Sequence, residues 1–195
     1  MLLENGAEVN ADGGEYGDAL QGASSKGYKA IVKLLLENGA EVNAKGGVYE
    51  NALQAASVRD NEAIVKLLLE NGAEVNAKGG VYGNALQAAS VSGNEAIVKL
   101  LLKNGAAVNV KGGEYDNALQ AVVESYHGNV AIVELLLYNG AEVNAKGGKY
   151  GNALQAASFQ GYEAIVKLLL ENGAEVNANM GMHSKKHQSV VPRQL

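Results

Sequence analysis

The chain has 195 residues, a formal net charge of −5 and 47% hydrophobic residues. Acidic and basic residues are interleaved, so no continuous positive surface is available for a phosphate backbone, and nucleic acid is disfavoured as a partner. No apolar run approaches the roughly 18 residues of a membrane-spanning helix, and the N-terminus lacks a signal-peptide pattern. The absence of cysteine excludes disulfides and thiolate metal sites. We therefore expect a soluble intracellular protein in the cytoplasm, with no membrane partner.

One phrase, GGxYxNALQAAS followed by AIVKLLLENGAEVNA, returns along the chain at nearly constant intervals. Its tyrosines are separated by 33, 33, 33 and 35 residues, and they are Tyr16, Tyr49, Tyr82, Tyr115 and Tyr150. A fixed period in this range indicates one supersecondary unit stacked repeatedly into a solenoid. We divide the chain into a partial N-terminal repeat (1–10), five repeats (11–43, 44–76, 77–109, 110–144 and 145–177) and a disordered tail (178–195).

Each repeat is predicted to contain two short helices, and the unit 79–111 serves as the example. Asn84 can accept the free N–H groups of a first turn and precedes good helix formers, so the first helix should begin there and stop before Gly93. Asn94 can cap a second helix that runs to about Asn104. In that helix the apolar residues recur at helical spacing, at Ile97, Val98, Leu101 and Leu102.

The rest of the unit is predicted to be a turn and an extended finger. Asn104-Gly105 resembles a hairpin turn, but it follows a helical pattern, so Gly105 is better interpreted as the left-handed residue that ends the helix. Residues 108–115 lack helical periodicity and are rich in glycine, which predicts an extended finger that turns back toward the next helix pair. One unit is therefore helix, turn, helix and finger.

The predicted fold class is all-α, a solenoid of stacked helix-turn-helix units with extended fingers. Alanine dominates the first helix, so neighbouring helices can approach closely, while leucine and isoleucine of the second helix fill the space toward the next unit. Each fully buried Leu or Ile contributes about 1.5 to 3 kcal/mol before entropy is subtracted. One unit cannot close its own core, so stability should grow with repeat number.

The unit resembles the ankyrin repeat, whose usual pattern reads GxTPLHxAAxxGHxEIVxxLLxxGADVNA, and the resemblance covers residues 11–177. The Thr-Pro-Leu-His of that family is replaced here by Asn84-Ala85-Leu86-Gln87, with Asp18 in place of the Asn in the first complete unit. An Asn or Asp cap must therefore replace part of the family's hydrogen bonds. The GGxYxNALQAAS variant is also similar to fungal ankyrin arrays that follow a NACHT-type nucleotide-binding domain, which implies a segment of a larger sensor protein.

The resemblance implies a non-catalytic protein–protein interaction module that binds a protein partner on the concave face formed by finger tips and first-helix ends. In this chain those positions vary between copies while the scaffold does not. Unrestrained drift of exposed positions is the alternative explanation of that variation. The predicted partner-binding residues are Glu15, Lys26, Val48, Arg59, Val81, Val91, Glu114, Glu124, Tyr126, His127, Lys149 and Phe159.

Two aromatic features have different interpretations. The five repeated tyrosines are interpreted as packing residues, because a residue that is identical in every unit favours contact between neighbouring fingers. Tyr126 and His127 belong to the two-residue insertion of the fourth complete repeat and are unique in the chain. Insertions there are easily tolerated, but this pair is our first choice for partner-specific contact.

No catalytic, cofactor or metal site is predicted. His183 and His187 are four residues apart, a spacing that can hold a metal on a helix, but the glutamate of a zinc protease motif is missing and the flanks are polar. With three histidines and no cysteine, no nucleophile, base and orienting group can be combined. We therefore predict that the chain is not an enzyme.

The end repeats provide an alternative function. Solenoids need terminal units with polar outer faces, yet residues 164–170 keep the apolar pattern of an interior helix. At the other terminus, Met1-Leu2-Leu3 aligns with Leu34-Leu35-Leu36, so the pattern begins within a second helix. These features favour a structural array that self-associates through uncapped end repeats.

Overall fold

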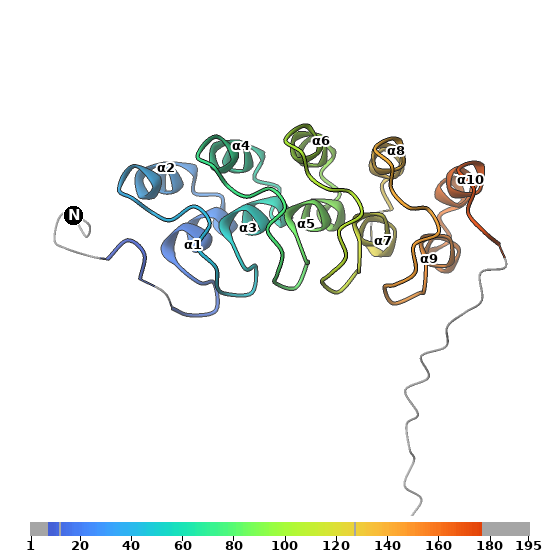
Figure 1. The fold of residues 1–195 in the computed structure, drawn as a ribbon, viewed down its shortest axis with the longest axis horizontal. Coiled ribbons are helices and arrows are strands. Elements are labelled where there is room, and N and C mark those ends of the chain that lie inside the picture. Colours follow the sequence, from blue (N-terminus) through green and yellow to red (C-terminus); the bar gives the residue numbers. More distant parts are fainter. Residues whose placement is uncertain (1–7, 12, 127, 177–195) are drawn as a thin grey trace, which may run out of the picture.

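The computed structural model describes residues 8–11, 13–126 and 128–176. Within them the chain forms five consecutive pairs of short helices (Figure 1). The first helix of each pair is α1 (Ala19–Lys26), α3 (Ala52–Val58), α5 (Ala85–Ser92), α7 (Ala118–Glu124) and α9 (Ala153–Gln160). The second is α2 (Lys29–Glu37), α4 (Glu62–Glu70), α6 (Glu95–Lys103), α8 (Val130–Tyr138) and α10 (Glu163–Glu171).

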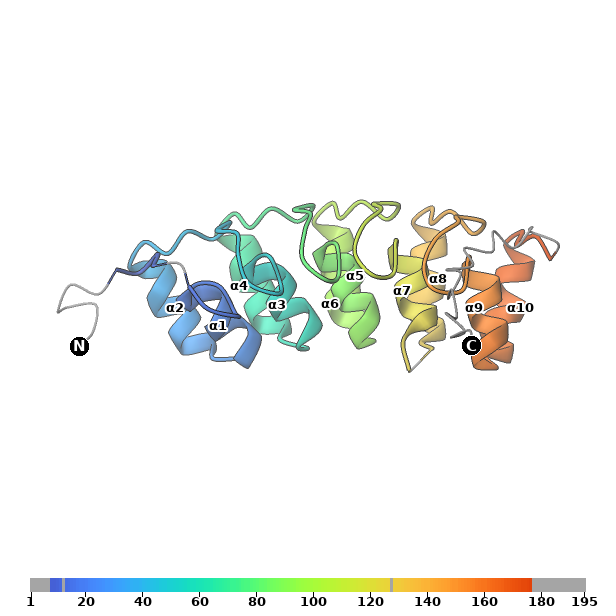
Figure 2. The same ribbon diagram turned by 90° about the horizontal axis from the view of Figure 1, so that it is seen from below.

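The helices form two layers, and the fingers lie on one side of them. The first helices pack side by side in an inner layer, the second helices form an outer layer, and the fingers project from the inner layer away from the outer one (Figures 1 and 2). Isolated antiparallel bridges close four fingers, between residues such as Gly46 and Glu50 or Gly79 and Gly83. The predicted all-α solenoid with extended fingers is confirmed.

The helix boundaries follow from the caps that the sequence indicates. The Asn84 side chain accepts from the N–H of Gln87 at 2.8 Å, and Asn94 accepts from Ile97 at 2.8 Å, so α5 and α6 begin where predicted. Asp18 performs the same task at the start of α1. Gly105 has φ +84° and follows α6, which confirms it as the left-handed residue past the helix end.

The core is a ribbon that continues through all five helix pairs. Leu86 of α5 is buried, as are Ile97, Val98 and Leu101 of α6, and the equivalent residues of neighbouring repeats join them in one cluster. Ala88 and Ala89 of α5 are fully buried, and such small side chains allow the inner helices to pack closely. Because every layer is covered by the next repeat, stacking completes the core.

We number the fingers one to five in the order of their tyrosines. Backbone hydrogen bonds join the first four of them. Val48 donates to the carbonyl of Glu15 at 3.0 Å, Val81 donates to Val48 at 3.3 Å, and Glu114 donates to Val81 at 2.9 Å. The bonded residues hold the same position in successive repeats. The fingers are therefore held in register with one another.

A second set of contacts between repeats comes from the asparagine of the VNA ending. Asn76 donates to the carbonyl of Gly105 at 3.0 Å and accepts from the N–H of Ala107 at 2.8 Å. Each of these asparagines bridges to the loop of the next repeat in the same two-bond arrangement, and the others are Asn10, Asn43, Asn109 and Asn144. One side chain therefore satisfies two backbone groups of the following repeat.

Asn76→Ala is expected to lower the free energy of unfolding by about 1 to 2 kcal/mol, because it removes two hydrogen bonds that cross a repeat boundary. Urea unfolding followed by circular dichroism measures the change. Asn104→Ala is the matched control, since the Asn104 side chain donates only to Leu100 within its own helix. Equal losses of unfolding free energy in the two variants would show that the bonds between repeats stabilise the protein no more than a bond within one repeat.

Candidate functional site

The candidate site is built on the tyrosine row, which we define as Tyr16, Tyr49, Tyr82, Tyr115 and Tyr150. These residues stand on successive fingers. Three of them contact a residue at the C-terminal end of an inner helix: Tyr16 with Lys26, Tyr49 with Arg59 and Tyr150 with Phe159. The rings of Tyr49 and Tyr82 are stacked, with centroids 6.3 Å apart and planes within 6°. The packing interpretation is thus confirmed for this pair, in which Tyr49 is buried.

The first two tyrosines each carry a cation from an inner helix end. Lys26 lies 5.7 Å from the ring centroid of Tyr16, and Arg59 lies 6.0 Å from that of Tyr49. Arg59 also donates from Nη2 to the Tyr49 hydroxyl at 2.9 Å, a bond that raises the pKa of Arg59. Its guanidinium is therefore held in one place on an exposed surface and remains charged.

Tyr82 lies between opposite charges. Burial raises the pKa of Tyr82, the neighbouring Tyr49 raises it further, Arg59 lowers it and Glu114 raises it. Both charged residues are therefore close enough to act on one hydroxyl. Arg59 therefore lies beside finger two, Val81, which is 48% exposed, on finger three, and the carboxylate of Glu114 on finger four.

The contact between fingers four and five differs from the others. Lys149 donates its backbone N–H to the Glu124 carboxylate, at 3.1 and 3.3 Å to the two oxygens, in place of a finger carbonyl. Burial raises the pKa of Glu124, although the backbone N–H groups of Lys149 and Tyr150 favour its charged form. A carboxylate from the end of α7 therefore replaces the backbone bond that joins the earlier fingers.

The two-residue insertion explains this replacement. Helix α7 ends at Glu124, the following Ser125 is extended and buried, and Tyr126 is 96% exposed. Tyr162 then reaches back across the insertion and donates from its hydroxyl to the Ser125 carbonyl at 3.0 Å. Side chains thereby fill the space that the longer loop opens between the repeats.

The structure places the predicted partner-binding residues on the fingers, the inner helix ends and the loop after α7. Glu15, Val48, Val81, Glu114 and Lys149 precede the row tyrosines. Nearly all of the predicted residues are exposed, but Val91 and Glu124 are half-buried. Phe159 packs against Tyr150 at 4.7 Å between ring centroids.

Several residues named from the sequence lie outside the described residues. They are Met1, Leu2 and Leu3, His127 of the insertion, and the predicted tail (178–195) with His183 and His187. Within the described ranges, no group of three or more His, Asp or Glu side chains is arranged to hold a metal ion. The same part of the chain contains no helix that is both long and apolar enough to cross a membrane.

The position after each row tyrosine has a role that the sequence analysis did not identify. All five occupants have positive φ, and they are Gly17, Glu50, Gly83, Asp116 and Gly151. A Cβ added at Gly83 would lie 2.3 Å from Oε1 of Gln87. Variation at this position is therefore restricted by backbone conformation and by the glutamine behind it. A left-handed residue at one place in every finger was the signal available in the glycine pattern.

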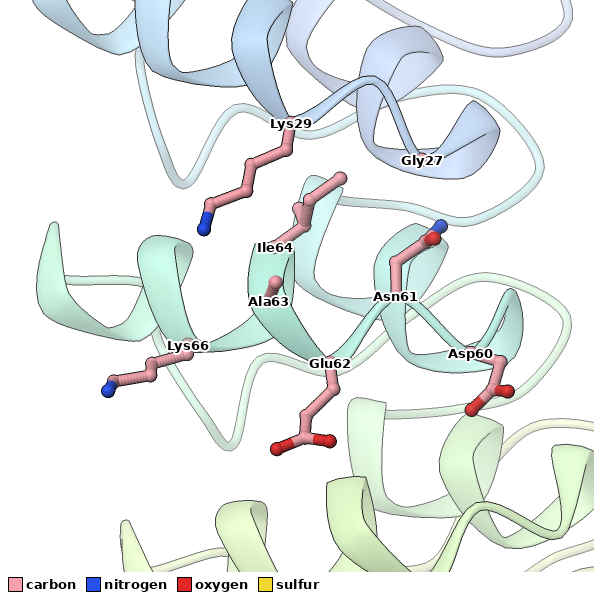
Figure 3. A pocket seen from close by; sticks show the side chains of 8 residues that line it. All are labelled: Gly27, Lys29, Asp60, Asn61, Glu62, Ala63, Ile64 and Lys66. Atoms are coloured by element: carbon pink, nitrogen blue, oxygen red, sulfur yellow. The ribbon is translucent and has the colours of Figure 1, made fainter.

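A separate pocket of about 500 Å³ lies between the N-terminal ends of α2 and α4 (Figure 3). Ala63 and Ile64 line it together with Lys29, Lys66 and Glu62. Its charged residues have both signs, and it includes none of the residues of the tyrosine row. It therefore offers no arrangement that selects a ligand charge.

The fold and the site define a helical-repeat solenoid with a rigid scaffold and a varied exposed surface. A family model described as ankyrin repeats (3 copies) matches residues 20–112 and 86–180. The chain belongs to the ankyrin-repeat family. Ankyrin repeats generally act as protein–protein interaction modules and are typically non-catalytic. A search of the curated proteins finds no match.

Glu124→Gln is expected to raise the free energy of unfolding at pH 7 and to have no such effect below about pH 4. Glutamine keeps an oxygen for the Lys149 N–H but has no charge to desolvate. Because the pKa of Glu124 is higher in the folded protein than in the unfolded one, the wild type loses stability as the pH rises from the unfolded pKa of about 4.3 through the folded pKa.

Urea unfolding of both proteins at pH 4 and pH 7 measures this difference. Glu134→Gln, which removes an exposed charge on α8, controls for the general effect of net charge. A wild-type protein that is more stable than Glu124→Gln at pH 7 would show that the charge itself is needed to hold finger five.

Proposed function

We propose that this chain is a non-catalytic protein-binding module that holds a partner protein against the concave surface of its tyrosine row. The observation that carries the proposal is the division of the repeat into two kinds of residue. Constant residues such as Leu86 are buried and others such as Asn76 bridge repeats, while the varied residues Arg59, Val81 and Glu114 are exposed on the fingers and the inner helix ends.

The rigidity of that surface supports the proposal. Fingers one to four are joined through their backbones, and Arg59 is fixed by its bond to Tyr49. A partner that binds such a surface loses less free energy to the ordering of the surface than it would on a mobile loop. Tyrosine and arginine are also the residue types most enriched among energetically dominant interface contacts.

The wider setting is a proposal that rests on the repeat motif alone. The GGxYxNALQAAS phrase is similar to arrays that follow a nucleotide-binding switch domain, and it supports a role as the partner-binding segment of a larger sensor protein. In such an arrangement the array selects the partner and another domain responds.

The combined variant Arg59→Glu, Val81→Asp and Glu114→Arg is expected to lose binding to partner fragments that the wild-type chain selects from a displayed proteome library. Three changed contacts in one surface should weaken affinity at least tenfold. Surface plasmon resonance on the selected fragments measures the loss. A second variant, Tyr126→Ala with His127→Ala, tests the insertion separately.

The control variant combines Lys103→Glu and Glu134→Arg on the exposed sides of α6 and α8. It makes comparable charge changes on the outer layer and should bind like the wild type. Fragments that bind both concave variants but not this control would place the interface on the outer helices and refute the proposal.

A second candidate function, self-association through the end repeats, is favoured by exposed apolar residues on α2. Ile31 is 46% exposed and Leu34 is 51% exposed, whereas Ile64, the residue of α4 that corresponds to Ile31, is buried. Near the other end of the described array, Leu170 and Val176 are also exposed. These faces correspond to those that bury each repeat against its neighbour.

If the ends associate, the weight-average mass from light scattering should rise with protein concentration. Ile31→Glu with Leu34→Glu should then restore the monomer mass, since a charged residue would have to be buried in the contact. A wild-type chain that stays monomeric at high concentration would exclude this function and leave the partner-binding proposal intact.

A further inference from the structure

The spacing of the fingers restricts the shape of a partner that follows the row. The rings of Tyr49 and Tyr82 are 6.3 Å apart, and backbone hydrogen bonds join equivalent residues of fingers two, three and four. An extended strand rises about 3.3 Å per residue and presents every second side chain on one face, about 6.6 Å apart. This interval matches the separation of the Tyr49 and Tyr82 rings, and continued to finger four it places one side chain of an extended peptide on each finger, at positions i, i+2 and i+4.

The chemistry of the three fingers differs in a fixed order. Beside finger two lies Arg59 at the end of α3, bonded to the Tyr49 hydroxyl, and it is exposed and has no carboxylate within salt-bridge distance among the described residues. Finger three presents the apolar Val81 beside the half-buried Tyr82. Finger four presents the exposed carboxylate of Glu114. The order along the row is basic, apolar and acidic.

The two charged positions belong to one site because hydrogen bonds join them. Glu114 donates its N–H to the Val81 carbonyl, Val81 donates to Val48, and the Tyr49 that follows Val48 holds Arg59 through its hydroxyl. Arg59 is also pre-ordered by Tyr49 and can accept a carboxylate in the planar two-bond geometry of guanidinium. An occupant with opposite charges at the matching spacing would satisfy both ends.

We propose that the partner is an extended peptide segment that carries an acidic residue, an apolar residue and a basic residue at every second position, seated on Arg59, Val81–Tyr82 and Glu114. This proposal rests on the proposed function and adds the chemistry of the partner to it. The register ends at finger four, because Lys149 of finger five bonds to Glu124 instead of to Glu114, and the regular finger-to-finger link stops there.

The test begins with a random nonapeptide display library selected on the wild-type chain. The enriched sequences should contain an acidic and a basic residue four positions apart, with an apolar residue midway between them, in either chain direction. A synthetic peptide of the most enriched sequence, labelled with a fluorophore, is then titrated with each protein variant by fluorescence anisotropy.

Arg59→Glu should weaken this peptide about tenfold or more, and a peptide in which lysine replaces the acidic residue should recover the affinity on that variant. Glu114→Arg should weaken the same peptide through the peptide's basic residue. The Glu114 side chain has no hydrogen-bond partner among the described residues, so this substitution should leave the fold intact. Lys103→Glu on α6 is the control and should leave the affinity unchanged.

The outcomes separate the two proposals. If the enriched peptides have another pattern but do not bind the combined concave variant, the proposal of an acidic–apolar–basic segment is overturned and the proposed function stands. If neither Arg59→Glu nor the combined concave variant changes the affinity of the enriched peptides, both proposals are overturned. A library that yields no enriched peptide at all would also overturn the segment, while the displayed protein fragments continue to test the function.

Discussion

A buried glutamine of the inner helix, as in α5 and α7, fixes the base of the next finger by hydrogen bonds. Gln87 donates from Nε2 to the carbonyls of Val110 and Asp116 at 2.9 and 3.2 Å, and Gln120 donates to Gly147 at 2.8 Å. A buried amide without hydrogen-bond partners is costly, so the base of each finger must lie where its carbonyls can accept from the glutamine. That constraint sets the finger register, and the finger register sets the spacing of the tyrosine row.

The same glutamine explains why the position after the row tyrosine alternates between glycine and an acid. Where glycine is present, as at Gly83, the amide oxygen of Gln87 lies against it and has no hydrogen-bond partner. Where Asp116 is present, Gln120 instead accepts from the cap Asn117 at 2.9 Å. Two arrangements of one buried amide therefore allow two kinds of residue in the finger, and this variation reflects internal packing.

Local patterns predicted most of the fold, because helices, caps and the glycine past each helix are encoded within a few residues, as at Asn84, Asn94 and Gly105. Contacts between repeats were harder to predict, since Asn76 bonds to residues about thirty positions away and its role depends on how units stack. The site was predicted only in part for the same reason. The varied residues can be identified in the sequence. The bond from Arg59 to Tyr49 and the bond from the Lys149 N–H to the Glu124 carboxylate depend on three-dimensional placement.

Curvature gives the array its directional surface. Fingers two and three are close enough for their tyrosine rings to stack, while the outer helices make fewer contacts with one another than the inner helices do (Figure 1). Residues that would be separated on the outer layer are therefore concentrated on the inner one, and charges from two repeats, Arg59 and Glu114, act on the Tyr82 hydroxyl between them. Because the scaffold bonds are insensitive to those charges, substitutions at the finger tips can change what the surface selects without changing its shape. A repeat array can in this way alter its recognition one finger at a time.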